Sequence, residues 1–127
     1  MSEKMIRVLK VEPGKEPEVT TLKNELYALQ DAVSIGAKER GCIEIVALEV
    51  GVCLLLNEEG KLLMLTPNRR LGNDFLAGVF YVVGTSGENL CSLNDEQIQK
   101  YMDMFKEPDT FDPFTYIDYI LDNMEMC

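Results

Sequence analysis

A short polar segment with two adjacent arginines contains the residues best suited to bind a ligand. Asn68, Arg69 and Arg70 follow an apolar stretch of the chain, and Lys61 and Asn73 lie nearby in the sequence. Arginine presents a planar fork of donors that fits phosphate or carboxylate, and asparagine can pair with an amide or a base edge. We therefore predict a ligand-binding site at these five residues, and a nucleotide-like molecule would bind there through its phosphates.

A structural role for the two arginines is the competing interpretation, and it is the commoner one for such pairs. Arg69 and Arg70 would then pair with Glu58, Glu59 or Asp74 and stabilise a turn. If the neighbouring segments form a hairpin, Lys61 starts from the opposite end of a strand and need not converge with the arginines.

The sequence contains no histidine. This absence removes Ser–His and Cys–His nucleophilic pairs and the usual general base near neutral pH. Glu58 and Glu59 are adjacent at a predicted turn, so they point apart, stay solvated and make a poor catalytic pair. We expect a protein that is not an enzyme and that needs no cofactor. An enzyme that uses carboxylate or tyrosine groups is the least favoured hypothesis.

The four cysteines show no pattern of a metal site. They have no C-x-x-C spacing and no histidine to complete a ligand set, so no metal is expected. Two of them lie in apolar strand contexts, which predicts buried reduced thiols for Cys42 and Cys53. The remaining cysteines are Cys91 and Cys127.

The size and hydropathy of the chain are typical of one globular domain, residues 1–127, with 46% hydrophobic residues. No apolar run approaches the roughly 20 residues that span a bilayer. The first seven residues pass directly into a strand-like pattern without a signal-peptide core. We therefore expect a cytoplasmic protein without membrane contact.

The charge is unevenly distributed along the chain. Residues 1–85 carry 10 basic and 12 acidic side chains, whereas residues 86–127 carry 2 basic and 10 acidic ones. Binding to duplex nucleic acid needs clustered Lys and Arg, so it is not expected. The acidic C-terminal region is most simply a solubilising helix surface. The sharper alternative is a surface that docks on a basic partner or mimics nucleic acid.

Residues 52–71 are predicted to organise the fold as a β-hairpin. Two apolar runs, residues 52–56 and 62–65, flank a turn at residues 57–61 in which Gly60 would supply a positive φ. Residues 66–70 would form a polar exit from this hairpin. The nearly continuous apolar content of residues 52–56 indicates a central strand that is covered on both faces.

The rest of the chain supplies further strands and three helices. Alternating or β-branched patterns predict strands at residues 5–11, 18–22, 42–48 and 75–83, the last with a bulge at Gly78. An early helix spans about residues 24–34, with Asn24 as its cap. The fold class is therefore α+β, with an antiparallel-rich mixed sheet of five or six strands, one early helix and two C-terminal helices.

The two C-terminal helices have the clearest signals. Asn94 and Gln97 fit a capping box, and Asp112 with Pro113 fits the start of the last helix. Each helix has an apolar stripe at helical spacing, which indicates core or dimer contacts. The stripes are Ile98, Tyr101, Met102 and Phe105 in the first helix, and Ile117, Ile120, Leu121 and Met124 in the second.

Five short motifs in order carry a family resemblance: residues 5–17 (MIRVLKVEPGKEP), 57–62 (NEEGKL), 67–71 (PNRRL), 77–84 (AGVFYVVG) and 92–98 (SLNDEQI). Over about residues 5–106 the chain resembles the DUF3846 family. That family is functionally uncharacterised and is similar to small proteins of bacterial mobile elements and phages. The chain departs from the family pattern at residues 35–41 and adds an acidic helix at about residues 111–125.

The resemblance implies a bacterial mobile-element or phage protein and supplies no catalytic residues. The leading hypothesis is a non-enzymatic protein-binding or adaptor module with a protein partner or a second copy of itself. The alternative is a small-molecule binding protein that holds a nucleotide with Asn68, Arg69 and Arg70.

Overall fold

The computed structural model describes residues 4–123. It contains a six-stranded sheet with strand order β2-β1-β7-β4-β3, in which β8 also pairs with β7, and every pairing is antiparallel. A separate two-stranded sheet is formed by β5 and β6. The strands are β1 (Met5–Val11), β2 (Glu18–Lys23), β3 (Ile43–Glu49), β4 (Val52–Asn57), β5 (Pro67–Leu71), β6 (Asp74–Ala77), β7 (Phe80–Ser86) and β8 (Asn89–Cys91).

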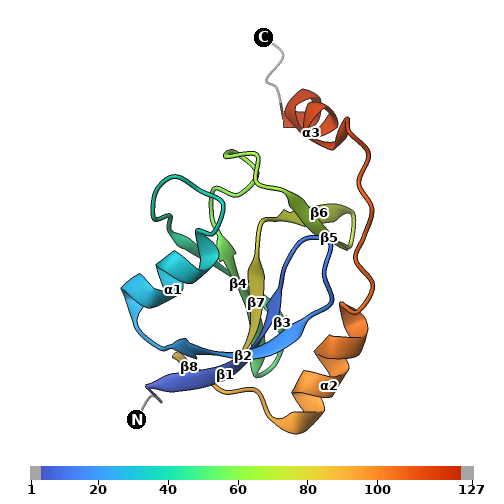
Figure 1. Cartoon of the computed structure of the whole chain (residues 1–127). Helices are drawn as coiled ribbons and strands as arrows, with labels where there is room; N and C mark the ends of the chain where they lie inside the picture. The colour runs from blue at the N-terminus through green and yellow to red at the C-terminus, as the bar shows by residue number, and fades with distance from the viewer. Residues whose placement is uncertain (1–3, 124–127) are drawn as a thin grey trace.

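Three helices complete the α+β fold that the sequence predicts. They are α1 (Leu26–Val33), α2 (Asp95–Met104) and α3 (Thr115–Asn123). Figure 1 shows α1 and α2 on opposite sides of the large sheet, while α3 lies apart at the end that also holds β5 and β6. Among the described residues, none of these helices has the length and apolar character needed to cross a membrane.

The core has one apolar layer on each face of the large sheet. Leu54 of β4 and Phe80 of β7 pack against the α2 residues Tyr101 and Phe105. On the other face, residues of the same strands pack against Leu29 and Val33 of α1. Strand β4 is buried along its whole length, so the prediction of a central strand covered on both faces is confirmed.

The predicted hairpin at residues 52–71 is wrong. Strand β4 pairs with β3 and β7, and residues 58–64 form a turn. Helix-like backbone bonds hold this turn, including one from Leu63 to Glu59. The run Leu-Leu-Met-Leu consists of good helix formers, whereas β7 offers aromatic and β-branched residues that favour strands. The positive φ of 55° belongs to Met64 rather than to Gly60.

The predicted strand at residues 75–83 divides at Gly78. Gly78 has a φ of 79°, which an L side chain rarely adopts, and the chain passes there from β6 in the small sheet to β7 in the large one. A Cβ on this residue would also lie 2.8 Å from Leu65 Cδ1. The sequence signal of a Gly inside a strand therefore marks a change of sheet.

The capping box predicted at the start of α2 is confirmed. Asn94 Oδ1 accepts a 2.8 Å hydrogen bond from the Gln97 amide, and Gln97 Oε1 accepts a 2.9 Å bond from the Asn94 amide. Of the predicted stripe, Tyr101 and Phe105 are buried, and the other two residues pack against the same core.

The other two helix starts differ from prediction. Glu25 stands at the N-cap of α1 without a side-chain cap, while the side-chain amide of Asn24 donates to the Leu90 carbonyl. Helix α3 begins at Thr115, and Asp112 accepts a hydrogen bond from the Phe114 amide just before it.

One cysteine also differs from prediction. Cys42 is exposed, and it precedes β3, an edge strand of which several residues are themselves exposed. Cys53 is buried as expected, and burial raises its pKa to about 11. Cys127 and the stripe residue Met124 lie outside the described residues.

Candidate functional site

The structure divides the predicted ligand site into a buried pair and a surface group. The segment Asn68-Arg69-Arg70 lies in strand β5 instead of an exit loop. An irregularity in the register between Pro67 and Arg69 lets the neighbours Asn68 and Arg69 both be buried, and Arg70 follows on the opposite side of the strand. Asn68 and Arg69 are 0% and 1% exposed, whereas Arg70 is exposed. Arg69 can therefore contact only the protein itself, whereas Arg70 can also contact a ligand at the surface.

Asn68 connects three parts of the backbone. Its side-chain amide nitrogen donates to the carbonyls of Val11 and Gly78, each at 2.8 Å. Its Oδ1 accepts a 2.9 Å bond from Arg69 Nη1. Asn68 thus joins β1 to the point where the chain changes sheet, and its polar atoms are satisfied by the protein itself.

Arg69 is held entirely by backbone carbonyls and by Asn68. Its Nε and Nη2 donate to the Phe105 carbonyl at 3.0 and 2.8 Å, Nη2 also donates to the Lys15 carbonyl, and Nη1 bonds to Asn68. Phe105 is the C-cap of α2, where a cation interacts favourably with the helix dipole. Burial lowers the pKa of Arg69, and the Asp109 carboxylate opposes this shift. No donor of this side chain faces solvent for a ligand.

The other three predicted residues meet at one surface hollow of about 570 Å³ between α3 and the β5–β6 turn, which we call the α3 hollow. Lys61 pairs with Asp74 and lies over the rings of Phe75 and Tyr119. Arg70 lies 4.7 Å from the ring centroid of Phe111. The expected partners Glu58 and Glu59 are not the partners of either arginine. The predicted residues that line this hollow are Lys61, Arg70 and Asn73.

Carboxylates outnumber the cations in the α3 hollow. Lys61 and Arg70 share it with four aspartates, and the backbone amide of Arg70 donates to a fifth, Asp109. An excess of negative charge disfavours a phosphate group and favours a cation. The aspartates that line it are Asp74, Asp112, Asp118 and Asp122.

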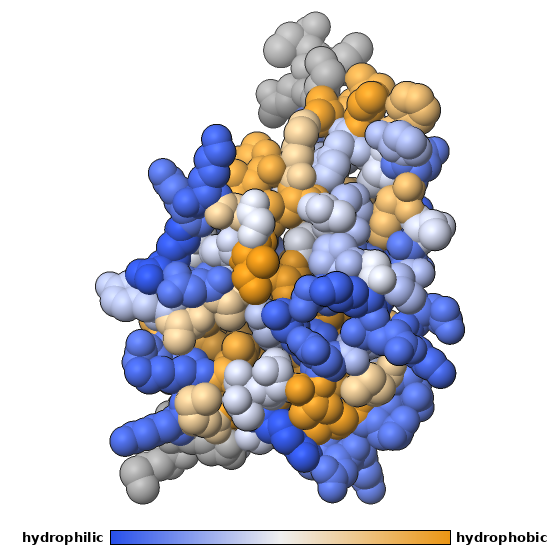
Figure 2. Space-filling model, viewed as in Figure 1, coloured by the Kyte–Doolittle hydropathy of each residue, from blue (hydrophilic) through white to orange (hydrophobic). Residues whose placement is uncertain are grey.

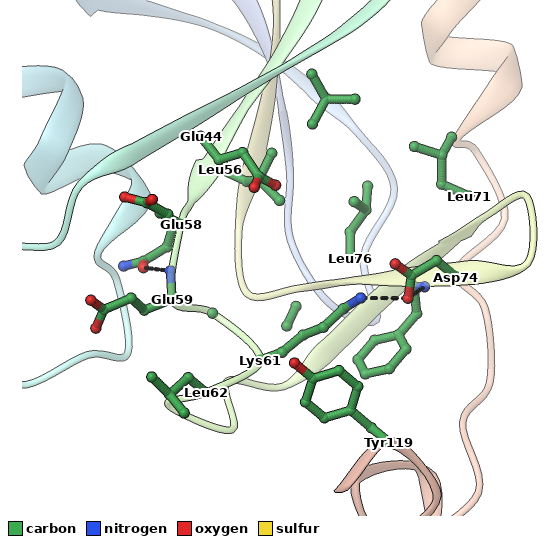
Figure 3. A pocket seen from close by; sticks show the side chains of 15 residues that line it. Glu44, Leu56, Glu58, Glu59, Lys61, Leu62, Leu71, Asp74, Leu76 and Tyr119 are labelled. Atoms are coloured by element: carbon green, nitrogen blue, oxygen red, sulfur yellow. Dashed lines mark hydrogen bonds and ion pairs between the residues drawn. The ribbon is translucent and has the colours of Figure 1, made fainter. Parts of the chain in front are cut away.

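A second hollow of about 540 Å³ lies on the other side of the Lys61–Asp74 pair, and we call it the β3 hollow (Figure 3). Its floor is apolar and includes Val46 and Leu56. Figure 3 shows Glu44 pointing toward this hollow, while Glu58 and Glu59 at its edge point away. The sequence carries no signal that singles out Glu44, because a strand with one outward carboxylate is common.

Aromatic side chains hold α3 against the small sheet. The ring of Phe75 lies 5.6 Å from that of Tyr116 and 6.2 Å from that of Tyr119, both edge-on. The Tyr116 hydroxyl donates to the Leu65 carbonyl. The ring of Phe111 also packs against Phe75, with the two centroids 5.9 Å apart. We call Phe75, Phe111, Tyr116 and Tyr119 the aromatic cluster.

The other side of α3 is apolar and exposed. Helical spacing brings Ile117 and Leu121 together, away from the two tyrosines, with Ile120 at the border between the two groups, and Leu121 is 61% exposed. Phe114, just before the helix, is also exposed. Figure 2 shows apolar side chains gathered at this end of the molecule. The sequence predicted this stripe as core or dimer contacts, and within this chain the described part of it is not core. We call Phe114, Ile117, Ile120 and Leu121 the outer face of α3.

Alkaline pH is expected to weaken the packing of α3. Burial raises the pKa of Tyr116 to about 12, and the same cause raises the pKa of Tyr81 and Tyr101 to about 12. Because the folded state favours the neutral phenol, its stabilisation is complete below the ordinary pKa of about 10 and is lost as the pH rises from 10 to 12.

A titration followed by tyrosinate absorbance and by near-ultraviolet circular dichroism tests this expectation. Replacing Tyr116 by phenylalanine should remove one of the late-titrating groups. If that variant titrates like the parent protein, the Tyr116 hydroxyl is not protected in the folded state.

The comparisons with known proteins give a family and no activity. A family model described as a domain of unknown function, DUF3846, matches residues 6–106. No curated protein and no solved structure matches the chain. The matched region contains both sheets, α1 and α2. Helix α3 lies beyond it.

Proposed function

Because the chain belongs to the DUF3846 family, which assigns no activity, we propose from its surfaces that it is a non-enzymatic protein-binding module. We also propose that the protein is encoded by a bacterial mobile element or phage, as the sequence resemblance implies, and that it acts in the cytoplasm of the host.

The observation that carries the proposal is that α3 is apolar on two sides. Its tyrosines pack on Phe75, and its outer face of Phe114, Ile117, Ile120 and Leu121 remains exposed. The apolar side of an amphipathic helix is usually covered, and the described chain leaves the outer face of α3 uncovered. Exposed apolar clusters with a polar rim typically mark interaction sites. The outer face is therefore the proposed docking surface for a partner.

The charge around α3 favours a basic partner. Residues 107–123 contain five acidic side chains and no basic one. Asp118 and Asp122 lie on α3 beside its outer face and line the α3 hollow. A second copy of the chain is a poorer occupant, because each copy carries a net charge of −10. The partner that fits is a protein with an amphipathic basic helix, whose apolar side would cover the outer face of α3.

Changing the outer face should abolish partner binding and leave the fold intact. We expect the double variant Ile117→Asp and Leu121→Asp to bind its partner about a hundredfold more weakly, because two anchor residues are replaced by charges. Val50→Asp is the matched control, since Val50 is fully exposed at the β3–β4 turn. Proteins that the parent captures would be purified, and their affinities for the parent, the α3 variant and Val50→Asp would be measured by calorimetry at two salt concentrations.

Two results would count against this proposal. A partner that binds the α3 variant as tightly as it binds the parent uses another surface. A captured protein whose affinity does not fall with added salt lacks the basic character inferred here.

The nucleotide-binding alternative has one supporting observation. Lys61, Arg70 and Asn73 line the same hollow. Ligand binding to the folded state raises the free energy of unfolding by about 2.7 kcal/mol at a hundredfold excess over Kd. A thermal shift with a nucleotide panel that disappears in Arg70→Ala would favour this alternative, whereas Arg69 is unsuited to the test because it is buried.

A further inference from the structure

The outer edge of β3 is an open strand edge. Strand β3 is the last strand of the large sheet on its side, and its backbone bonds within the described chain go to β4. The register is regular from Ile43 to Ala47 and shifts only after it. Native proteins usually protect such edges with lysine, proline or a covering segment. Strand β3 contains no lysine and no proline.

The two faces of β3 offer different surroundings to a strand that paired with it. Glu44 and Val46 line the β3 hollow on one face. Ile45 points to the opposite face, where it is 62% exposed. The other edge strand, β2, lacks this combination: its residues are Glu-Val-Thr-Thr-Leu-Lys, and it lines none of the hollows described above.

We infer that the β3 edge binds an extended peptide segment in which basic and apolar residues alternate. The peptide would add a strand to the large sheet and pair its backbone with β3. Its basic side chains would lie over the β3 hollow, where Glu44 points inward and the apolar floor contacts their aliphatic stems. Its apolar side chains would lie on the other face beside Ile45.

Charge decides the occupant of this edge. Glu44 lies on β3, and Glu58 and Glu59 lie at the margin of the hollow, all three without an ion-pair partner within the described chain. A basic segment gains favourable contacts with Glu44, while Glu58 and Glu59, which point away from the hollow, add only to the negative charge around it. An acidic or neutral segment gains neither. Pairing of β3 with β3 of a second copy would instead bring two strongly acidic chains together.

The probe for this inference is a synthetic peptide of alternating lysine and valine, about seven residues long to match the length of β3, with blocked ends. Two matched peptides accompany it, one with glutamate in place of each lysine and one N-methylated at every second residue. Binding is measured by calorimetry, and its location by amide chemical shifts and hydrogen exchange of residues 43–49. We expect the first peptide to bind and to protect amides of β3, and both control peptides to bind at least about tenfold more weakly.

Glu44→Lys and Glu44→Gln provide the matching changes in the protein. Glu44 is exposed, so neither variant is expected to alter the fold. Charge reversal should weaken binding of the lysine peptide by roughly tenfold and neutralisation by less. The α3 double variant Ile117→Asp and Leu121→Asp should leave this binding unchanged, which separates the test from that of the proposed function.

Three outcomes would overturn the inference. The first is a lysine peptide that fails to bind at millimolar concentration. The second is a peptide that binds while shifting amides of α3 instead of those of β3. The third is an N-methylated peptide that binds as tightly as its parent, which would show simple attraction between charges without strand pairing.

Discussion

Replacing Arg69 by alanine is expected to lower the free energy of unfolding by about 3–5 kcal/mol. The guanidinium lies at the junction of three segments, since it bonds to the carbonyls of Phe105 at the end of α2 and Lys15 in the β1–β2 turn, and to Asn68 in β5. Alanine would leave buried carbonyls without donors and an empty volume where the side chain lay.

Urea denaturation of matched variants measures this effect. Arg70→Ala is the control, because Arg70 is the neighbouring arginine on the exposed side of the strand, and it should cost less than about 1 kcal/mol. Arg69→Lys should fall between the two, since lysine keeps the charge but cannot donate twice to Phe105 from a planar fork. A loss below about 1 kcal/mol for Arg69→Ala would contradict the structural role assigned to this side chain.

The same pair of variants bears on the ligand site that the sequence suggested. A buried arginine whose donors are all bonded to the protein affects ligand affinity only through the fold. Loss of ligand binding in Arg69→Ala would therefore be uninformative without the stability measurement. Arg70→Ala has no such complication and is the variant that tests the α3 hollow.

The sequence alone could not separate Arg69 from Arg70, and the reason is the secondary structure assigned to them. As residues of an exit loop they appear equivalent. As residues of β5 they must point to opposite sides, one into the protein and one to solvent. The sequence does contain a signal for this strand. Residues 68–70 lie between Thr66-Pro67 and the turn residues Gly72-Asn73, a pattern that is typical of a short strand in a hairpin.

Elements with strong local signals were predictable. The Asn94–Gln97 capping box and the alternating strands β1 and β3 depend on neighbouring residues, and the structure contains them. The hairpin failed because two apolar runs can each pair with β4. The choice between Leu62–Leu65 and β7 depends on long-range packing against α1 and α2, which a local pattern does not contain.

The exposed side of α3 shows a similar limit. A helical stripe predicts an apolar surface, but it does not say what covers it. In this chain the tyrosines that precede and interrupt the stripe make the intramolecular contacts, because the aromatic residue Phe75 of β6 lies opposite them. The aliphatic residues are left for an intermolecular contact in the function proposed above.

Replacing Phe75 by alanine is expected to release α3 from the small sheet. Phe75 is the centre of the aromatic cluster, with ring contacts to Phe111, Tyr116 and Tyr119, and Lys61 Nζ lies 4.8 Å from its centroid. The packing of this ring stabilises the docked helix by about 3 kcal/mol. The cluster is separate from the two layers of the main core, so its disruption should appear as local opening.

Hydrogen exchange resolved by segment measures this release. Amides of residues 115–123 should exchange about a hundredfold faster in Phe75→Ala, whereas amides of β4 should keep the protection of the parent protein. Phe114→Ala is the matched control, because Phe114 is an exposed phenylalanine of the same region and does not belong to the cluster. Unchanged exchange in α3 would show that the cluster does not hold the helix.

The variant Phe75→Ala also tests whether the proposed partner needs α3 to be held in place on the small sheet. Phe75 is buried beneath α3 and does not contribute to the outer face, so it can affect a partner only by holding the helix in place. If the partner binds α3 while the helix is packed on the small sheet, Phe75→Ala weakens binding, because part of the binding free energy is then needed to hold the helix in that position. If the partner takes up α3 as a free segment, the affinity rises, because the competing contact with Phe75 is gone.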